Sequence, residues 1–107
     1  MKNIVDRLRD EDIIFRSLKE LQPKEFGSRK KINIYLGVER SDYYAIVISI
    51  SKKSRILKKE VGELMEFHSK LESKIDSKIK NRYIVIQAPL CSKAKALFEE
   101  NGWRVIV

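Results

Sequence analysis

The chain has little of what thiol enzymes, nucleotide-binding proteins and membrane proteins depend on. Its 107 residues include one cysteine, one histidine, two prolines and four glycines. One cysteine excludes an intrachain disulfide and a cysteine zinc cluster, and scattered glycines form no phosphate-binding loop. No apolar run approaches the roughly 20 residues that a membrane span requires. We expect no membrane contact and, because residues 1–14 mix charges unlike a secretory signal, a cytoplasmic location.

The remaining composition is that of one folded domain. A chain of this length has room for one hydrophobic core. Its hydrophobic fraction of 43% falls in short periodic segments, which is typical of globular rather than disordered proteins. We therefore expect a single domain over residues 1–107.

The net charge of +8 is concentrated in one third of the chain. Residues 24–59 hold ten basic and three acidic residues, whereas residues 1–23 hold five of each and residues 60–107 hold eight and seven. A local excess of lysine and arginine indicates an anionic partner, and nucleic acid is favoured because its phosphates are densely spaced. The alternative is a generally solvated, lysine-rich surface, since 36% of all residues are charged.

Hydrophobic periodicity predicts the order helix, strand, strand, helix, strand, helix, strand. The first helix is expected after Asp10 or Asp12, since Ile14, Leu18 and Leu21 recur at helical spacing, and Pro23 ends it. The other elements are predicted at residues 32–38, 43–51, 56–79, 82–88, 93–100 and 103–107. A further strand within residues 24–29 stays open. An antiparallel hairpin followed by two strand–helix–strand crossovers gives an α/β fold with a small mixed sheet flanked by helices.

The hairpin, KINIYLGVERSDYYAIVISISKKSR at residues 31–55, carries the strongest functional signal. Alternation places Asn33 opposite the apolar face of the first strand, and Ser49 and Ser51 on one face of the second. In outline, and in the elements that follow, this segment resembles the metal-binding hairpin of the PD-(D/E)XK, or restriction-endonuclease-like, nucleases. That family carries an aspartate on the first strand and Glu-x-Lys on the second, where this chain has Asn33, Ser49 and Ser51. The resemblance implies a restriction-endonuclease-like fold with a degenerate site that has no catalytic residues, metal or other cofactor.

The family's chemistry explains why these three residues matter. Two carboxylates hold Mg²⁺ against the phosphate, and a lysine helps to position the attacking water. A neutral amide or hydroxyl is a much weaker ligand for a hard cation. Two alternatives stay open. The three residues are ordinary polar residues on a half-exposed strand, or the metal ligands have moved to Glu60 and Glu63 and the chain is a metal-dependent nuclease.

Basic residues converge at one end of the hairpin, because the start of its first strand and the end of its second are adjacent. We predict that they bind the backbone of DNA or RNA without reading bases. The alternative is a protein-interaction or dimerisation module that uses exposed sheet edges, for example as partner of an active nuclease. The predicted binding residues are Arg29, Lys30, Lys31, Lys52, Lys53, Arg55, Lys58 and Lys59.

The remaining reactive or aromatic side chains receive structural interpretations. His68 lies on an apolar helix stripe, so we expect it to hydrogen-bond the backbone rather than to bind a ligand. Cys91 precedes a helix start that would favour a thiolate, but without a partner it is expected to be a small packing residue. Four tyrosines are able to stack on bases, although packing is their more frequent role, and alternation lets only one of the adjacent pair join any one surface. They are Tyr35, Tyr43, Tyr44 and Tyr83.

Overall fold

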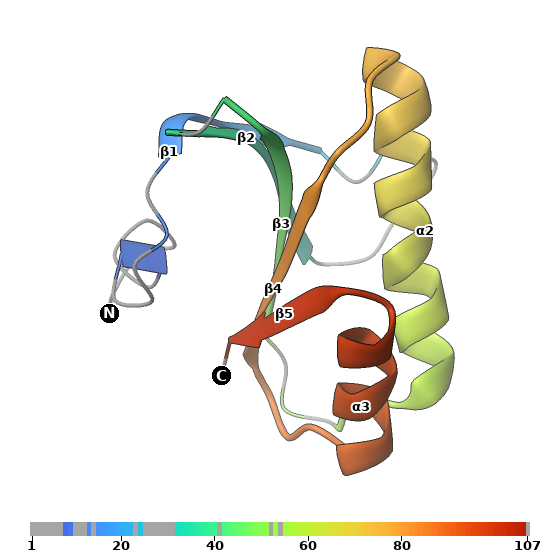
Figure 1. Ribbon diagram of the computed structural model, residues 1–107. Helices are drawn as coiled ribbons and strands as arrows, with labels where there is room; N and C mark the ends of the chain where they lie inside the picture. Colours follow the sequence, from blue (N-terminus) through green and yellow to red (C-terminus); the bar gives the residue numbers. More distant parts are fainter. Residues whose placement is uncertain are drawn as a thin grey trace.

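The computed structural model describes residues 8–9, 13, 15–22, 24, 32–40, 42–51, 53 and 55–106. Within them, a five-stranded mixed sheet in the order β1-β2-β3-β4-β5 has two helices on one face (Figure 1). Strands β1, β2 and β3 are antiparallel neighbours, and β3, β4 and β5 are parallel, as the crossovers predict. The elements are β1 (Phe15–Leu21), β2 (Ile32–Glu39), β3 (Tyr44–Ser51), α2 (Lys58–Ile75), β4 (Asn81–Gln87), α3 (Ser92–Glu100) and β5 (Trp103–Ile106).

The first predicted element is wrong, because the segment expected to be the end of a helix is the edge strand β1. A β-bulge between Phe15 and Ser17 interrupts the alternation of its side chains. Phe15 and Leu18 consequently contact the same hydrophobic cluster, whereas Leu21 reaches the cluster on the other face by ordinary alternation. The apolar residues are therefore three apart, a spacing that resembles that of a helix. Upstream, residues 8–9 are helical. The observed order is therefore β-β-β-α-β-α-β, and the strand left open within residues 24–29 falls mostly outside the described residues.

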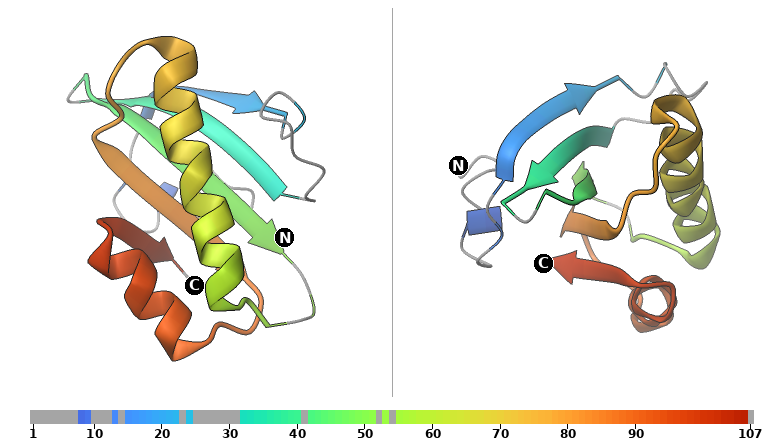
Figure 2. Two further views of the ribbon diagram at one scale, coloured as in Figure 1. Left: turned by 90° about the vertical axis from the view of Figure 1, so that its right-hand side faces the viewer. Right: turned by 45° about the horizontal axis from the view of Figure 1, so that its top comes forward.

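Two hydrophobic clusters sit on the two faces of the sheet. The larger one lies under α2 and α3, and Figure 2 shows both helices on the same side of the twisted strands. It takes Ile46, Ile48 and Ile50 from β3. The smaller cluster takes the alternate residue Val47, and residues 8 and 13 pack against it from the opposite side. Neither described helix is both long and apolar enough to cross a membrane.

A carboxylate fastens β2 to β4 across β3 on this second face. Glu39 accepts a hydrogen bond from the Tyr83 hydroxyl at 2.8 Å and another from the Asn81 amide. Burial, and then the bond to Glu39, raises the pKa of Tyr83. The Tyr83 ring meets Phe15 edge-on, with centroids 6.3 Å apart. Phe15 in turn packs so closely on Gly37 that a Cβ there would lie 2.5 Å from its ring, so glycine is required.

His68 anchors the connection between α2 and β4. Its Nε2 lies 3.0 Å from the carbonyl oxygen of Ile79, so this nitrogen donates, and the Glu72 carboxylate accepts from the Ile79 amide at 2.7 Å. Both backbone groups of Ile79 are thus bound by side chains of α2. The expectation that His68 hydrogen-bonds the backbone is confirmed.

Candidate functional site

The parallel strands β3 and β4 end at one edge of the sheet, and α2 and α3 begin beside it (Figure 1). An isolated bridge joins Ile56 to Leu90, and the Ile56 amide donates to the carbonyl of Pro89 at 3.0 Å. This pairing holds the two helix starts together. The carboxyl ends of strands are where open α/β sheets bind ligands. Two groups of side chains meet there: polar residues on the sheet and cations at the helix starts.

The polar residues lie on the sheet face that α2 and α3 leave uncovered. The register pairs Asn33 with Ser49, and Ser51 with Gln87 of β4. Because alternate residues share a face, all four lie on the same one, and we refer to them as the polar strip. The three positions that the family resemblance singled out are therefore neighbours in space. Gln87 was not identified from the sequence, since its place beside Ser51 depends on the parallel pairing of β3 with β4, which joins residues 36 positions apart in the chain.

Glu20 of β1 brings a carboxylate to the polar strip. It pairs with Tyr35 in register, and the Asn33 amide donates to its Oε2 at 3.2 Å. Burial, followed by the charge and hydrogen bond of Glu20, raises the pKa of Tyr35. Sequence reasoning missed Glu20 because it assigned residues 14–21 to a helix. An alternating pattern interrupted by one extra residue was the signal that would have found it.

These donors do not fit the Mg²⁺ site that the resemblance implies for an active nuclease. A hard divalent cation takes several anionic or carbonyl oxygens. Here the polar strip is neutral, and its neighbouring carboxylate, Glu20, is engaged by an amide. No group of three His, Cys, Asp or Glu side chains able to hold a metal occurs within the described residues.

The proposed relocated ligands lie on α2, on the covered side of the sheet. The Oε1 of Glu60 is 3.4 Å from the backbone nitrogen of Leu57, so this carboxylate serves the start of the helix. Glu63 follows on the same helix, one turn later. The polar strip occupies the opposite face, so the structure does not bring Asn33 together with either glutamate.

Cations surround the starts of α2 and α3. Lys58 and Lys93 line a shallow hollow of about 230 Å³ between the two helices. Five exposed cations at this end form no ion pair with a carboxylate of the described residues. We refer to them as the basic edge: Lys53, Arg55, Lys58, Lys59 and Lys93. Lys93 was missed because only the bridge between the helix starts brings it there, and Arg29, Lys30, Lys31 and Lys52 of the predicted set lie outside the described residues.

Three lysines of the basic edge lie in the first turns of helices, where acidic residues are preferred. Lys58 and Lys59 open α2, Lys93 is the second residue of α3, and the first turn of α3 holds no acid. Cations are unfavourable at a helix N-terminus, where the macrodipole is positive. The backbone amides of Ala94 and Lys93, assisted by the charge of Arg55, lower the pKa of the Cys91 thiol. This end of the molecule therefore has a field that favours anions.

Solved structures with a similar fold include those of EndoMS and of a repair endonuclease. EndoMS in its apo form matches with a TM-score of 0.56 and 17% identity, over 99% of this chain and 46% of that one. EndoMS in complex with double-stranded DNA matches with a TM-score of 0.55 and 17% identity, over 92% of this chain and 39% of that one. A repair endonuclease from Pyrococcus abyssi matches with a TM-score of 0.53 and 16% identity, over 85% of this chain and 38% of that one. No protein-family model and no curated protein matches the sequence.

These likenesses establish the fold. The chain shares with EndoMS and the Pyrococcus abyssi repair endonuclease an α/β architecture, which among the described residues consists of a five-stranded mixed sheet and two helices. It spans less than half the length of each of these nucleases.

Proposed function

We propose that this domain binds the backbone of nucleic acid at its basic edge and does not cleave it. The observation that carries the proposal is the placement of Lys58, Lys59 and Lys93, which form no ion pair with a carboxylate of the described residues, in the first turns of two neighbouring helices. Such lysines cost stability unless an anion lies beside them. Residues that break a local rule are expected at functional sites. A phosphate at this edge would neutralise the lysines.

The size and sign of the basic edge favour nucleic acid over a small anion. Lys53 and Arg55 leave β3, Lys58 and Lys59 open α2, and Lys93 lies on α3, so the charges follow a line of segments rather than one point. A line of cations suits a polymer with evenly spaced charges, because each neutralised phosphate releases counterions. EndoMS, which shares the fold, was solved with double-stranded DNA. Backbone contacts of this kind serve DNA and RNA alike.

The polar strip supports binding without catalysis. A PD-(D/E)XK reaction needs two carboxylates and a lysine, and here Asn33, Ser49 and Ser51 occupy neighbouring positions on the hairpin. Glu20 is the single described carboxylate bonded to this strip. One carboxylate is too few for the metal chemistry.

Two measurements test the proposal. The first is fluorescence anisotropy with a labelled duplex over a range of salt, where log affinity should fall linearly with log salt. A slope near zero would refute backbone binding. The second incubates the same duplex with protein and Mg²⁺ or Mn²⁺, with the Glu20→Gln variant as control. No cleavage is expected, and cleavage that disappears in Glu20→Gln would overturn the non-catalytic half of the proposal.

A further inference from the structure

The end of β3 opposite the basic edge presents tyrosine side chains to solvent. Tyr43 and Tyr44 are 47% and 38% exposed, whereas Tyr83 is buried and Tyr35 is packed against the cluster of the second face. Strand β3 separates these tyrosines from the basic edge by about 23 Å, at roughly 3.3 Å per residue. The exposed tyrosines Tyr43 and Tyr44 therefore form a surface separate from the basic edge.

Backbone hydrogen bonds join the described residues next to Tyr43. The Glu39 amide donates to the carbonyl of Tyr43 at 3.0 Å, and the Asp42 amide donates to the carbonyl of Glu39 at 2.9 Å. Asp42 adopts a left-handed conformation with φ of 68°, and its carboxylate is paired with Arg16. The hydrogen bond from Glu39 restrains the backbone of Tyr43, which reduces the entropy cost of ordering it when a ligand binds.

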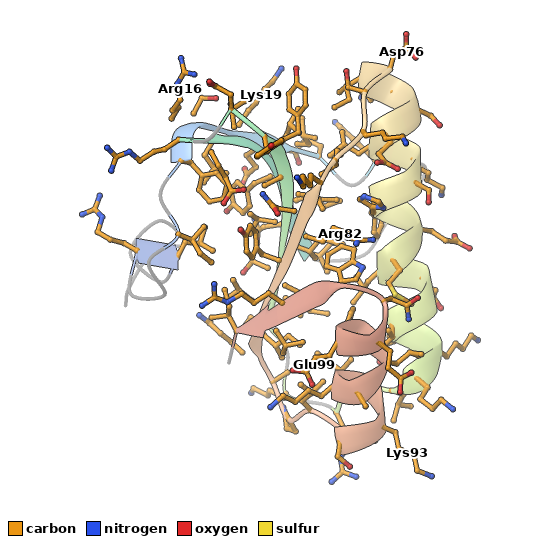
Figure 3. All side chains as sticks on the ribbon, viewed as in Figure 1. Arg16, Lys19, Asp76, Arg82, Lys93 and Glu99 are labelled. Carbon is orange, nitrogen blue, oxygen red and sulfur yellow. The ribbon has the colours of Figure 1, made fainter. Side chains whose placement is uncertain are left out.

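The surroundings of Tyr43 are positively charged. The Lys80 ammonium lies 4.1 Å from the centre of the Tyr43 ring. Arg40 in the turn and Lys78 in the neighbouring connection are exposed and form no ion pair with a described carboxylate. The acids of the turn are engaged, Asp42 by Arg16 and Glu39 by Tyr83. Figure 3 shows Arg16 at this end of the molecule and Lys93 at the other.

We propose that Tyr43 is a stacking site for an unpaired nucleobase, whose flanking phosphates are held by Arg40, Lys78 and Lys80. This inference rests on the proposed nucleic-acid binding and names the form of nucleic acid: a single strand, or a duplex with an unpaired segment. Stacking on an aromatic ring accepts any base, because every base has a π face. A fully paired duplex keeps its bases stacked inside and gains nothing from Tyr43.

The test compares two ligands of equal length, a single strand of about 16 nucleotides and its fully paired duplex. Tyr43→Ala should weaken binding of the single strand by roughly 5- to 150-fold, which is the usual range for loss of one stacked base, and leave duplex binding unchanged. Tyr43→Phe keeps the ring and should restore single-strand affinity. Tyr44→Ala is the matched control, because it removes the adjacent exposed tyrosine, over whose ring no cation of the described residues lies.

The outcomes separate this inference from the proposed function. Unchanged single-strand affinity in Tyr43→Ala, with binding still weakened in a Lys58→Ala, Lys59→Ala variant, would overturn the stacking site and leave backbone binding standing. Equal losses for both ligands in Tyr43→Ala would also overturn it, because stacking acts on the unpaired base alone. Failure of the unsubstituted protein to bind either ligand would overturn both proposals. Thermal unfolding of each variant checks that the exposed substitutions leave the fold intact.

Discussion

Replacing Lys58 and Lys59 with alanine should make the protein more stable and a weaker binder. Both lysines are exposed and lie at the first two positions of α2. A charge of unfavourable sign at an exposed helix end costs about 0.3 kcal/mol at low ionic strength. Removing two such charges should therefore raise the free energy of unfolding by about 0.6 kcal/mol. For a domain of this size the midpoint of thermal unfolding should rise by roughly 2–5 °C.

The same substitutions should reduce the salt dependence of binding by a calculable amount. If each of the five cations of the basic edge contacts one phosphate, the slope of log affinity against log salt is about −4.5 for a duplex, and it falls to about −2.7 with three cations. Between 50 and 200 mM salt the unsubstituted protein should then lose roughly 500-fold in affinity and the variant roughly 40-fold. Anisotropy titrations at four or more salt concentrations measure both slopes.

Lys70 and Lys74 provide the matched control on the same helix. Their replacement with alanine changes the net charge equally, but about 20 Å farther along α2. Lys74 lies in the last turn, where a cation is favourable, so this variant should lose a little stability and keep the slope of about −4.5. Equal slopes in the two double variants would mean that binding follows net charge alone. That result, or a loss of stability in the Lys58→Ala, Lys59→Ala variant, would refute the reasoning.

Three further predictions concern the second face of the sheet. Gly37→Ala should cost about 1–3 kcal/mol in thermal unfolding, because its Cβ would overlap the Phe15 ring; an unchanged midpoint would contradict this packing. Tyr83→Phe should cost about 1.5 kcal/mol at neutral pH through loss of the bond to Glu39. Because folding raises the pKa of Tyr83, the stabilisation is complete below about pH 10 and is lost as pH rises through the folded-state value, so the variant should show a shallower loss of stability in alkali. Millimolar Mg²⁺ should leave the unfolding midpoint unchanged in the protein and in Glu20→Gln; a rise that Glu20→Gln abolishes would reveal a metal site.

The elements that were predicted well are those with local signals. The hairpin follows from two alternating runs around a polar turn, and β4 and β5 from short apolar runs beside turn residues. The helix predicted at residues 56–79 is shorter in the structure, where α2 runs from Lys58 to Ile75. Its buried residues are Val61, Leu64, Phe67 and Leu71, whereas Leu57 is 55% exposed. Leu57 precedes the first helical residue, so helical spacing does not apply to it.

The error at β1 has a specific physical cause. An edge strand exposes Arg16, Lys19 and Glu20 on a short segment, which weakens the alternating pattern. The bulge places Phe15 on the same face as Leu18, and Leu21 lies on the other face three residues later, so the apolar residues of the strand are spaced as in a helix. Pairing with β2 decides the outcome, and that pairing lies outside any local window of sequence.

The candidate site divides in the same way. Asn33 and Ser49 follow from hairpin register, which a turn of known length fixes. Glu20 and Lys93 do not, because each depends on a neighbour brought by tertiary structure: the pairing of β1 with β2 for Glu20, and the bridge between the two helix starts for Lys93. The site residues that the sequence analysis did not identify are those that distant segments of the chain bring to the site.

The neutral polar strip and the basic edge are consistent with one requirement, which is to hold phosphate without a metal. Two carboxylates at Asn33 and Ser49 would repel a phosphate unless a divalent cation lay between them, by about 1 kcal/mol for each pair of unit charges 4 Å apart in water. Neutral side chains remove that repulsion, and Glu20 keeps its charge bonded to the Asn33 amide. It follows that Asn33→Asp with Ser49→Glu should weaken backbone binding in the presence of a chelator. If affinity were instead unchanged, the bound backbone would have to lie away from the polar strip, on the helix starts alone.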